Sequence, residues 1–144
     1  MLERIGEMLF VDAARRHLEG LPEGAEGWLA GLRDPYVGKS LSAIHDEPAR
    51  TWTLDDLAGR SRLSRSAFYE RFVRLVGQSP MQYLTNWRMQ LAASLLGNSH
   101  ATVASIALEV GYESETAFIR AFKRTTGSSP SMWRREQTGQ HTVP

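Results

Sequence analysis

The sequence contains no cysteine and no long uninterrupted apolar run. The absence of cysteine excludes a disulfide scaffold, a thiol nucleophile and a thiolate metal site. Nothing in the 144 residues approaches the run of about eighteen apolar residues that a membrane-spanning helix needs. The first ten residues, MLERIGEMLF, contain acidic residues where a secretion signal would contain basic ones. These absences predict a soluble, cytoplasmic protein with no membrane partner.

The sequence also lacks the residue patterns of an enzyme. Its four histidines are scattered without metal-ligand spacing, and we expect them to be solvated or to cap helices. It has neither a glycine-rich phosphate-binding loop nor a Gly-x-Ser-x-Gly turn. We therefore predict a protein that is not an enzyme, with no catalytic residue, no bound metal and no cofactor.

Charge is distributed unevenly, although the net charge is only +1. Residues 1–49 hold five Lys/Arg and nine Asp/Glu, whereas residues 50–135 hold twelve Lys/Arg and six Asp/Glu. This asymmetry indicates a basic segment with an anionic partner, joined to a segment with another role. A basic face that is merely exposed to solvent is the common alternative.

Apolar residues recur at helical spacing, and no stretch alternates long enough to predict a strand. The spacing predicts a helix over 2–19, a short helix that contains Trp28 and ends near Asp34, and another helix over about 37–47. Hydroxyl N-caps, prolines in the first turn and terminal glycines mark the remaining helices. These are expected to begin at Thr53, Ser64, Ser79-Pro80, Thr102, Ser114 and Ser129-Pro130. The long helix from Pro80 is expected to end at Gly97-Asn98, and the last helix at Trp133.

The apolar faces of these helices predict the core. The inward residues are expected to be Ala67, Phe68, Phe72, Leu75, Leu84, Trp87, Leu91, Leu95, Leu96, Ala117, Phe118 and Phe122. We expect the aromatic residues in this set, together with Trp133, to pack in the core and not to stack on bases.

An internal repeat is the most informative feature of the chain. SRSAFYERFVRLVGQSP (64–80) and SETAFIRAFKRTTGSSP (114–130) share eight identical positions at an offset of fifty residues. Each copy follows a short capped helix, so the repeated unit is a short helix, a tight turn and a longer helix. One such unit could equally be an αα-hairpin that packs only on its neighbours. Two units, each with a basic second helix, favour a pair of DNA-binding helix-turn-helix motifs.

Residues 53–135 resemble the tandem helix-turn-helix domain of the AraC/XylS family of bacterial transcription regulators. The resemblance is carried by residues 64–80, WRMQLAASLL (87–96), SIALEVGYES (105–114) and FIRAFKRTTGSSP (118–130). It implies an all-α fold in which a long linker helix (about 80–96) joins two helix-turn-helix lobes (about 53–76 and 102–126). Seven helices would form a DNA-binding domain over 37–135, after an extra N-terminal helical segment (1–36) and before a flexible tail (136–144).

The resemblance also implies how the domain reads DNA. Helices 64–76 and 114–126 would enter successive major grooves about 34 Å apart. The residues expected to contact base edges are Ser66, Tyr69, Glu70, Glu115, Thr116, Ile119 and Arg120. Phosphate contacts are expected from Arg65, Arg71, Arg74, Arg88, Lys123, Arg124 and Arg134.

Several of these assignments have alternatives. Arg120, the strongest candidate for guanine readout, could instead contact a phosphate. Family members often have a basic residue at the position of Glu70, so this sequence departs from the family there. The Glu70 carboxylate either accepts a hydrogen bond from a cytosine amino group or is only solvated. Glu115 could simply cap its helix, and Arg88 could form a structural contact at the edge of the core.

The acidic segment 1–36 is not expected to bind DNA. The resemblance implies that this segment connects the DNA-binding domain to an N-terminal effector domain, so we expect the chain to be the C-terminal part of a longer regulator. The alternative is a naturally short member of the family without an effector domain. The segment would either pack on the domain or form a homodimer. The resulting prediction is a sequence-specific, nucleoid-associated transcription regulator whose partners are double-stranded DNA and RNA polymerase. The rival is a helical protein-interaction module derived from such a domain, a reading that Glu70 and Glu115 favour.

Overall fold

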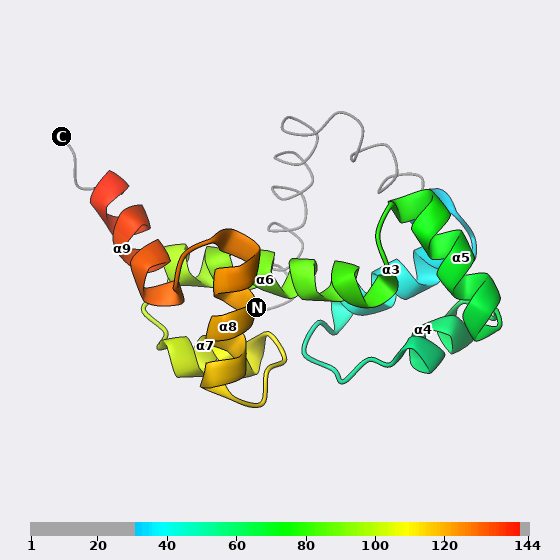
Figure 1. Ribbon diagram of the computed structural model, residues 1–144, viewed down its shortest axis with the longest axis horizontal. Helices are drawn as coiled ribbons and strands as arrows, with labels where there is room; N and C mark the ends of the chain where they lie inside the picture. The colour runs from blue at the N-terminus through cyan, green and yellow to red at the C-terminus, as the bar shows by residue number, and fades with distance from the viewer. Residues whose placement is uncertain (1–30, 142–144) are drawn as a thin grey trace. The chain divides into compact units, whose positions relative to one another are not determined.

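The computed structural model describes residues 31–141, with side chains described through residue 138. All regular structure in this range is helical, which confirms the all-α prediction (Figure 1). The helices are α3 (Val37–Asp46), α4 (Leu54–Arg60), α5 (Arg65–Val76), α6 (Pro80–Asn98), α7 (Val103–Glu109), α8 (Glu115–Thr126) and α9 (Pro130–His141). The helix predicted over 2–19, the residue Trp28 and most of the segment 1–36 lie outside the described residues.

Local sequence signals set the helix boundaries where they were expected. Thr53 caps α4 in a capping box, because its side chain accepts from the Asp56 N–H and the Asp56 carboxylate accepts from the Thr53 N–H. The Ser64 and Ser114 side chains cap α5 and α8 in the same position of the repeat. Both helices end at a left-handed glycine, Gly77 or Gly127, a backbone conformation that glycine adopts without steric cost.

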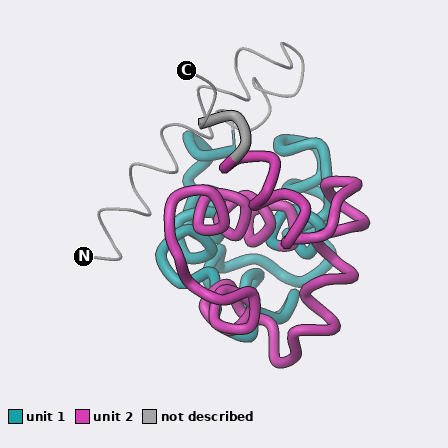
Figure 2. Tube along the Cα trace, turned by 90° about the vertical axis from the view of Figure 1, so that its left-hand side faces the viewer, with its two compact units in different colours: residues 1–84 teal, residues 85–144 magenta. Residues whose placement is uncertain are grey.

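The chain divides into two compact units, residues 1–84 and 85–144 (Figure 2). In the first unit α4 and α5 form one helix-turn-helix motif, and α3 packs against both. The largest apolar side chains of this core are fully buried: Val37, Leu41, Ile44, Leu57, Phe68 and Phe72. Each such side chain contributes about 1.5–3 kcal/mol when it leaves water. Burial of these side chains therefore holds α5 in place against the rest of the unit.

Two buried serines add a polar tie within the first unit. The Ser40 Oγ of α3 donates to the Leu57 carbonyl at 2.7 Å and is hydrogen-bonded to the Ser61 hydroxyl at the end of α4. Each hydroxyl thus has a partner despite its burial, as buried polar groups require. The tie holds the end of α4 against α3.

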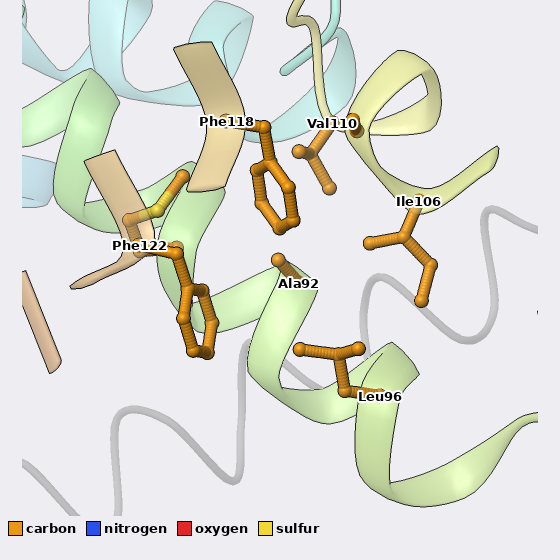
Figure 3. Packing of buried hydrophobic residues seen from close by; sticks show 8 residues of the cluster. Ala92, Leu96, Ile106, Val110, Phe118 and Phe122 are labelled. Atoms are coloured by element: carbon orange, nitrogen blue, oxygen red, sulfur yellow. The ribbon is translucent and has the colours of Figure 1, made fainter. Parts of the chain in front are cut away.

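The second unit repeats the arrangement with α7 and α8. Figure 3 shows Phe118 and Phe122 of α8 directed toward Ala92 and Leu96 of α6, with Ile106 beside them. Trp133 of α9 closes the core edge-to-face on Phe122, with ring centroids 5.9 Å apart. Packing in this cluster holds α8 in place, as the packing of Phe68 and Phe72 holds α5 in the first unit.

Several details of the predicted core are wrong. Ala67 and Ala117 are exposed, because the apolar stripe of α5 and α8 is narrow and is filled by the two phenylalanines of each helix. Leu75 of α5 and Leu91 and Leu95 of α6 are only partly buried, whereas Met89 is 1% exposed. A prediction from apolar spacing assigns one buried face to each helix. It therefore misses residues on a second face that another element of the structure covers.

The end of the last helix also differs from the prediction. α9 continues to His141, past Trp133 and past the expected start of the tail at residue 136. None of the helices in residues 31–141 is long and apolar enough to cross a membrane.

Candidate nucleic-acid interface

The first turns of α5 present the predicted base-reading side chains to solvent. Ser66, Tyr69 and Glu70 are exposed, and Tyr69 keeps 45% of its accessible surface. Phe68 and Phe72 of the same helix are fully buried, so the polar face is held outward by the apolar one. The three residues lie together on the exposed side of α5 and are accessible to a ligand.

The second reading helix, α8, exposes a similar set with one exception. Glu115, Thr116 and Arg120 are exposed, whereas Ile119 is half-buried against the core of the second unit. Ile119 was expected to face outward; packing on this core leaves only part of its side chain available for contact with a thymine methyl. Arg120 stands clear of the core, as a base-reading guanidinium must.

Four of the seven predicted phosphate-contacting cations lie exposed on α5 and α8, three of them in the second half of their helix. They are Arg74 on α5 and Arg120's neighbours Lys123 and Arg124 on α8, together with Arg65 at the start of α5. Burial raises the pKa of the Tyr112 phenol, and the positive charges of Arg88 and Arg124 partly oppose this rise. The four exposed cations can reach a polyanion without disrupting a core.

Arg65 already has an acidic partner within its own helix-turn-helix motif. Its Nε and Nη2 donate to Asp55 Oδ1 and Oδ2 of α4 at 2.8 and 2.6 Å. The hydrogen bond with Arg65 lowers the pKa of the Asp55 carboxyl. Because both side chains are about two-thirds exposed, the pair contributes little to stability and can open.

Arg71 is held far more firmly. Its Nε and Nη2 donate to the Asp34 carboxylate, the shortest of these bonds being 2.6 Å, and its guanidinium lies 4.9 Å from the centre of the Tyr36 ring. The Asp34 side chain is only 8% exposed, and its carboxylate also accepts from the Tyr36 and Val37 N–H groups at the start of α3. The hydrogen bond from Arg71 lowers the pKa of Asp34 against the opposing effect of burial. The structure thus places Arg71 in a clamp between α5 and the start of α3, a position that competes with the predicted phosphate contact.

Arg134 and Arg88 are also engaged by the protein. Arg134 donates to the Leu96 carbonyl at 3.0 Å and the Ala101 carbonyl at 2.6 Å, and so caps the end of α6. Arg88 is half-buried beside the Tyr112 ring, and burial lowers its pKa. The surroundings of Arg88 therefore match the alternative prediction for this residue, a structural contact at the edge of the core. Arg134 is likewise engaged in structural contacts.

His45 is neither solvated nor a helix cap, contrary to the expectation for the histidines. Its Nε2 lies 2.6 Å from the Tyr83 hydroxyl, and burial lowers its pKa to about 4. It is therefore neutral at physiological pH. Sequence reasoning could not place it, because its partner lies 38 residues away.

These observations define a tandem helix-turn-helix protein, with two core-anchored helices that expose polar faces. A helix-turn-helix domain family matches residues 57–136, more than half of the chain. The chain belongs to this family, and within it to the AraC type, as the resemblance of its repeat implied.

Relatives and solved structures agree with this assignment. The chain is 47% identical over 136 residues to a protein named as an AraC-like transcription regulator of Streptomyces lividans, and 37% identical over 136 residues to the HTH-type transcriptional regulator AlkR of Acinetobacter baylyi. Each match covers 94% of this chain but only 45% and 44% of the relative. The chain therefore spans less than half the length of these relatives.

The fold is similar to that of two DNA-binding or regulator domains. The DNA-binding domain of AdpA, solved in complex with a target DNA, matches with a TM-score of 0.72 and 29% identity, covering 77% of this chain and 99% of that one. The C-terminal domain of AraT from Geobacillus stearothermophilus matches with a TM-score of 0.69 and 30% identity, covering 72% of this chain and 86% of that one. The likeness thus extends over the whole tandem domain and is not confined to a single motif.

Proposed function

We propose that the chain is the DNA-binding part of a bacterial transcription regulator and that it recognises a specific duplex sequence. The observation that carries the proposal is the repeated unit itself: α5 and α8 each stand on a phenylalanine core and expose polar, partly basic faces. A helix of this kind fits the major groove, which is about 12 Å wide. The AdpA domain, which has the same fold, was solved on DNA.

In this proposal α5 and α8 read successive major grooves on one side of the duplex, about 34 Å apart. Ser66, Tyr69 and Glu70 contact bases from α5; Thr116, Arg120 and the exposed part of Ile119 do so from α8, with Glu115 at the helix start. Arg74, Lys123 and Arg124 neutralise phosphates, and Arg65 joins them when its exposed pair with Asp55 opens. In this proposal the main role of Arg71, Arg88 and Arg134 is to make contacts that stabilise the fold.

RNA polymerase and a second copy of the regulator, joined through residues 1–36, are the further proposed partners. The protein would act in the cytoplasm, at the nucleoid, because the ligand that it binds is chromosomal DNA. Both partners fit a regulator that couples an operator to transcription.

Selection of bound fragments from a random duplex pool would test the proposal and supply the operator. The enriched duplex and a scrambled duplex are then titrated at two salt concentrations. The proposal expects much tighter binding of the enriched duplex and a linear fall of log K with log salt of about 0.9 per phosphate neutralised. Equal affinity for both duplexes would refute sequence specificity.

The role of Arg120 can be tested with the same duplex. Arg120→Ala should cost about 1–3 kcal/mol, and the loss should vanish when the contacted base pair is changed. A loss that is uniform over all sequences would assign Arg120 to a phosphate. Lys123→Gln is the matched control, because it should weaken binding to every sequence alike.

A helical protein-interaction module is the second candidate function, favoured by the exposed acids Glu70 and Glu115 on the two reading faces. Carboxylates on a DNA-facing surface are repelled by phosphates. If no duplex is enriched from the pool while a partner protein is retained by the chain, this second function replaces the first.

A further inference from the structure

The turn between α4 and α5 has an unusual residue at its centre. Arg62 adopts φ +55°, and it is the non-glycine residue with positive φ in the described part of the chain. The left-handed region is costly for a residue with a Cβ, so it is normally occupied by glycine or asparagine. A side chain kept there against this cost needs a reason that the backbone does not supply.

The hydrogen bonds of the turn identify the backbone motif. The Leu63 N–H donates to the Ala58 carbonyl and the Arg62 N–H donates to the Gly59 carbonyl, each at 3.1 Å. This pair of bonds is a Schellman motif, in which the residue after the C-cap is left-handed. Ser61, the C-cap, is buried and hydrogen-bonded to Ser40, so the turn is held from both sides.

The second helix-turn-helix motif contains the same turn with the residue that the motif prefers. After α7 the Tyr112 N–H donates to the Ala107 carbonyl at 2.8 Å and the Gly111 N–H donates to the Leu108 carbonyl at 3.1 Å. Gly111 has φ +106°. The two copies of the repeat therefore form the same hydrogen-bonded turn, and the strained arginine occurs in the first copy where the second has glycine.

The two turns also differ in charge. The residue that ends α4 is Arg60, whereas the residue that ends α7 is Glu109. Arg60 is exposed, and its guanidinium lies 5.6 Å from the centre of the buried Trp52 ring. The Arg62 side chain is exposed, and the structure gives its guanidinium no hydrogen bond or ion pair within residues 31–141. Two cations without an ion pair in the described residues thus lie at the end of α4 and in the turn that leads to α5, the helix that presents Tyr69.

We propose that Arg62, with Arg60 beside it, is a phosphate-binding rim of the first helix-turn-helix motif that the second motif lacks. The ligand is a backbone phosphate of the duplex that α5 reads, so this inference rests on the proposed DNA binding. The positive charge of Arg62 gives a reason for an arginine in a conformation that favours glycine. The rim would make the contacts of the domain asymmetric and strengthen the hold of the first motif.

The test compares Arg62→Gly and Arg62→Lys with the wild-type chain on the duplex selected from the random pool. Arg62→Gly suits the left-handed backbone, so its melting temperature should not fall below that of the wild type. It removes one phosphate contact, so log K should depend less steeply on log salt by about 0.9. The advantage of the wild type over this variant should then shrink roughly three- to fourfold between 50 and 200 mM salt. Arg62→Lys, which keeps the charge, should retain the wild-type slope.

Arg33→Gln is the matched control, because it removes one exposed charge outside both helix-turn-helix motifs and should leave the slope unchanged. The inference is overturned if Arg62→Gly keeps the wild-type slope, or if it melts at a lower temperature, which would show that the arginine stabilises the end of α4. Either result leaves specific binding by the wild type intact. If the wild type itself selects no duplex, it is the proposed function that fails.

Discussion

Replacing Asp34 by asparagine separates the structural role of Arg71 from its predicted DNA contact. Asp34→Asn keeps a side-chain oxygen for the Tyr36 and Val37 N–H groups, both 2.9 Å away, but removes the charge that Arg71 grips. Charged hydrogen bonds contribute roughly 1.5–3 kcal/mol. Since Arg71 is one-third exposed and partly screened by solvent, we expect a loss of about 2 kcal/mol in the free energy of unfolding. That loss corresponds to roughly 10 °C in melting temperature for a domain of this size.

Denaturant unfolding of the wild type, Asp34→Asn, Arg71→Met and the double variant measures the coupling directly. If the pair accounts for the effect, Asp34→Asn should cost much less in the Arg71→Met background than in the wild type. The stabilisation should also depend on pH. Because Arg71 lowers the pKa of Asp34 below its ordinary 3.8, the contribution is present above that value and is lost as the pH falls through the lower, folded-state pKa.

DNA titration of Arg71→Met completes the test. A clamp without a phosphate role predicts an unchanged salt slope, measured under conditions where the variant is folded. A slope shallower by about 0.9 would show that Arg71 contacts a phosphate. Additive effects of the two substitutions on unfolding, or an Asp34→Asn variant as stable as the wild type, would refute the clamp.

Three further predictions concern stability and are read from urea unfolding. His45 has a folded pKa of about 4 against an ordinary 6.5, so stability should fall by about 1 kcal/mol per pH unit as the pH drops between these values, and His45→Gln should flatten that dependence; parallel profiles would contradict its burial as a neutral ring. Arg134→Met should cost about 1–2 kcal/mol, because the Leu96 and Ala101 carbonyls lose their donor, and should leave the salt slope of DNA binding unchanged; a changed slope would restore its phosphate role. Gly77→Ala should cost about 1 kcal/mol because of its φ of +90°, whereas the control Gly59→Ala, within α4 and with open space around it, should stabilise by about 0.5–1 kcal/mol; equal effects would refute the conformational argument.

The helices could be predicted because their signals act over a few residues. Thr53 meets Asp56 three positions away, and Ser64 caps the helix that begins at the next residue. The internal repeat then multiplied the evidence, since each element of one motif predicts its counterpart in the other. The family and the exposed faces of α5 and α8 followed from the same local information.

The engaged arginines could not be predicted in this way. Arg71 meets Asp34 across 37 positions, and Arg134 meets Leu96 across 38. No periodicity relates such pairs, so a basic residue committed to the fold has the same appearance in the sequence as one free to bind phosphate. The burial of Met89, in place of Leu91 and Leu95, has a similar origin, because the faces that α6 buries depend on what packs against it.

Composition, caps and the fifty-residue repeat were sufficient to predict a pair of helix-turn-helix motifs, and the resemblance of the repeat to the AraC/XylS family predicted which helices would read DNA. These features depend on backbone hydrogen bonding and on apolar spacing, both of which are written within a few turns of chain. Only the folded chain shows which cations remain available to a polyanion, that the partly buried His45 ring is neutral, and that Arg62 adopts a backbone conformation typical of glycine. Each depends on groups brought together, or on a backbone conformation imposed, by packing between segments distant in sequence.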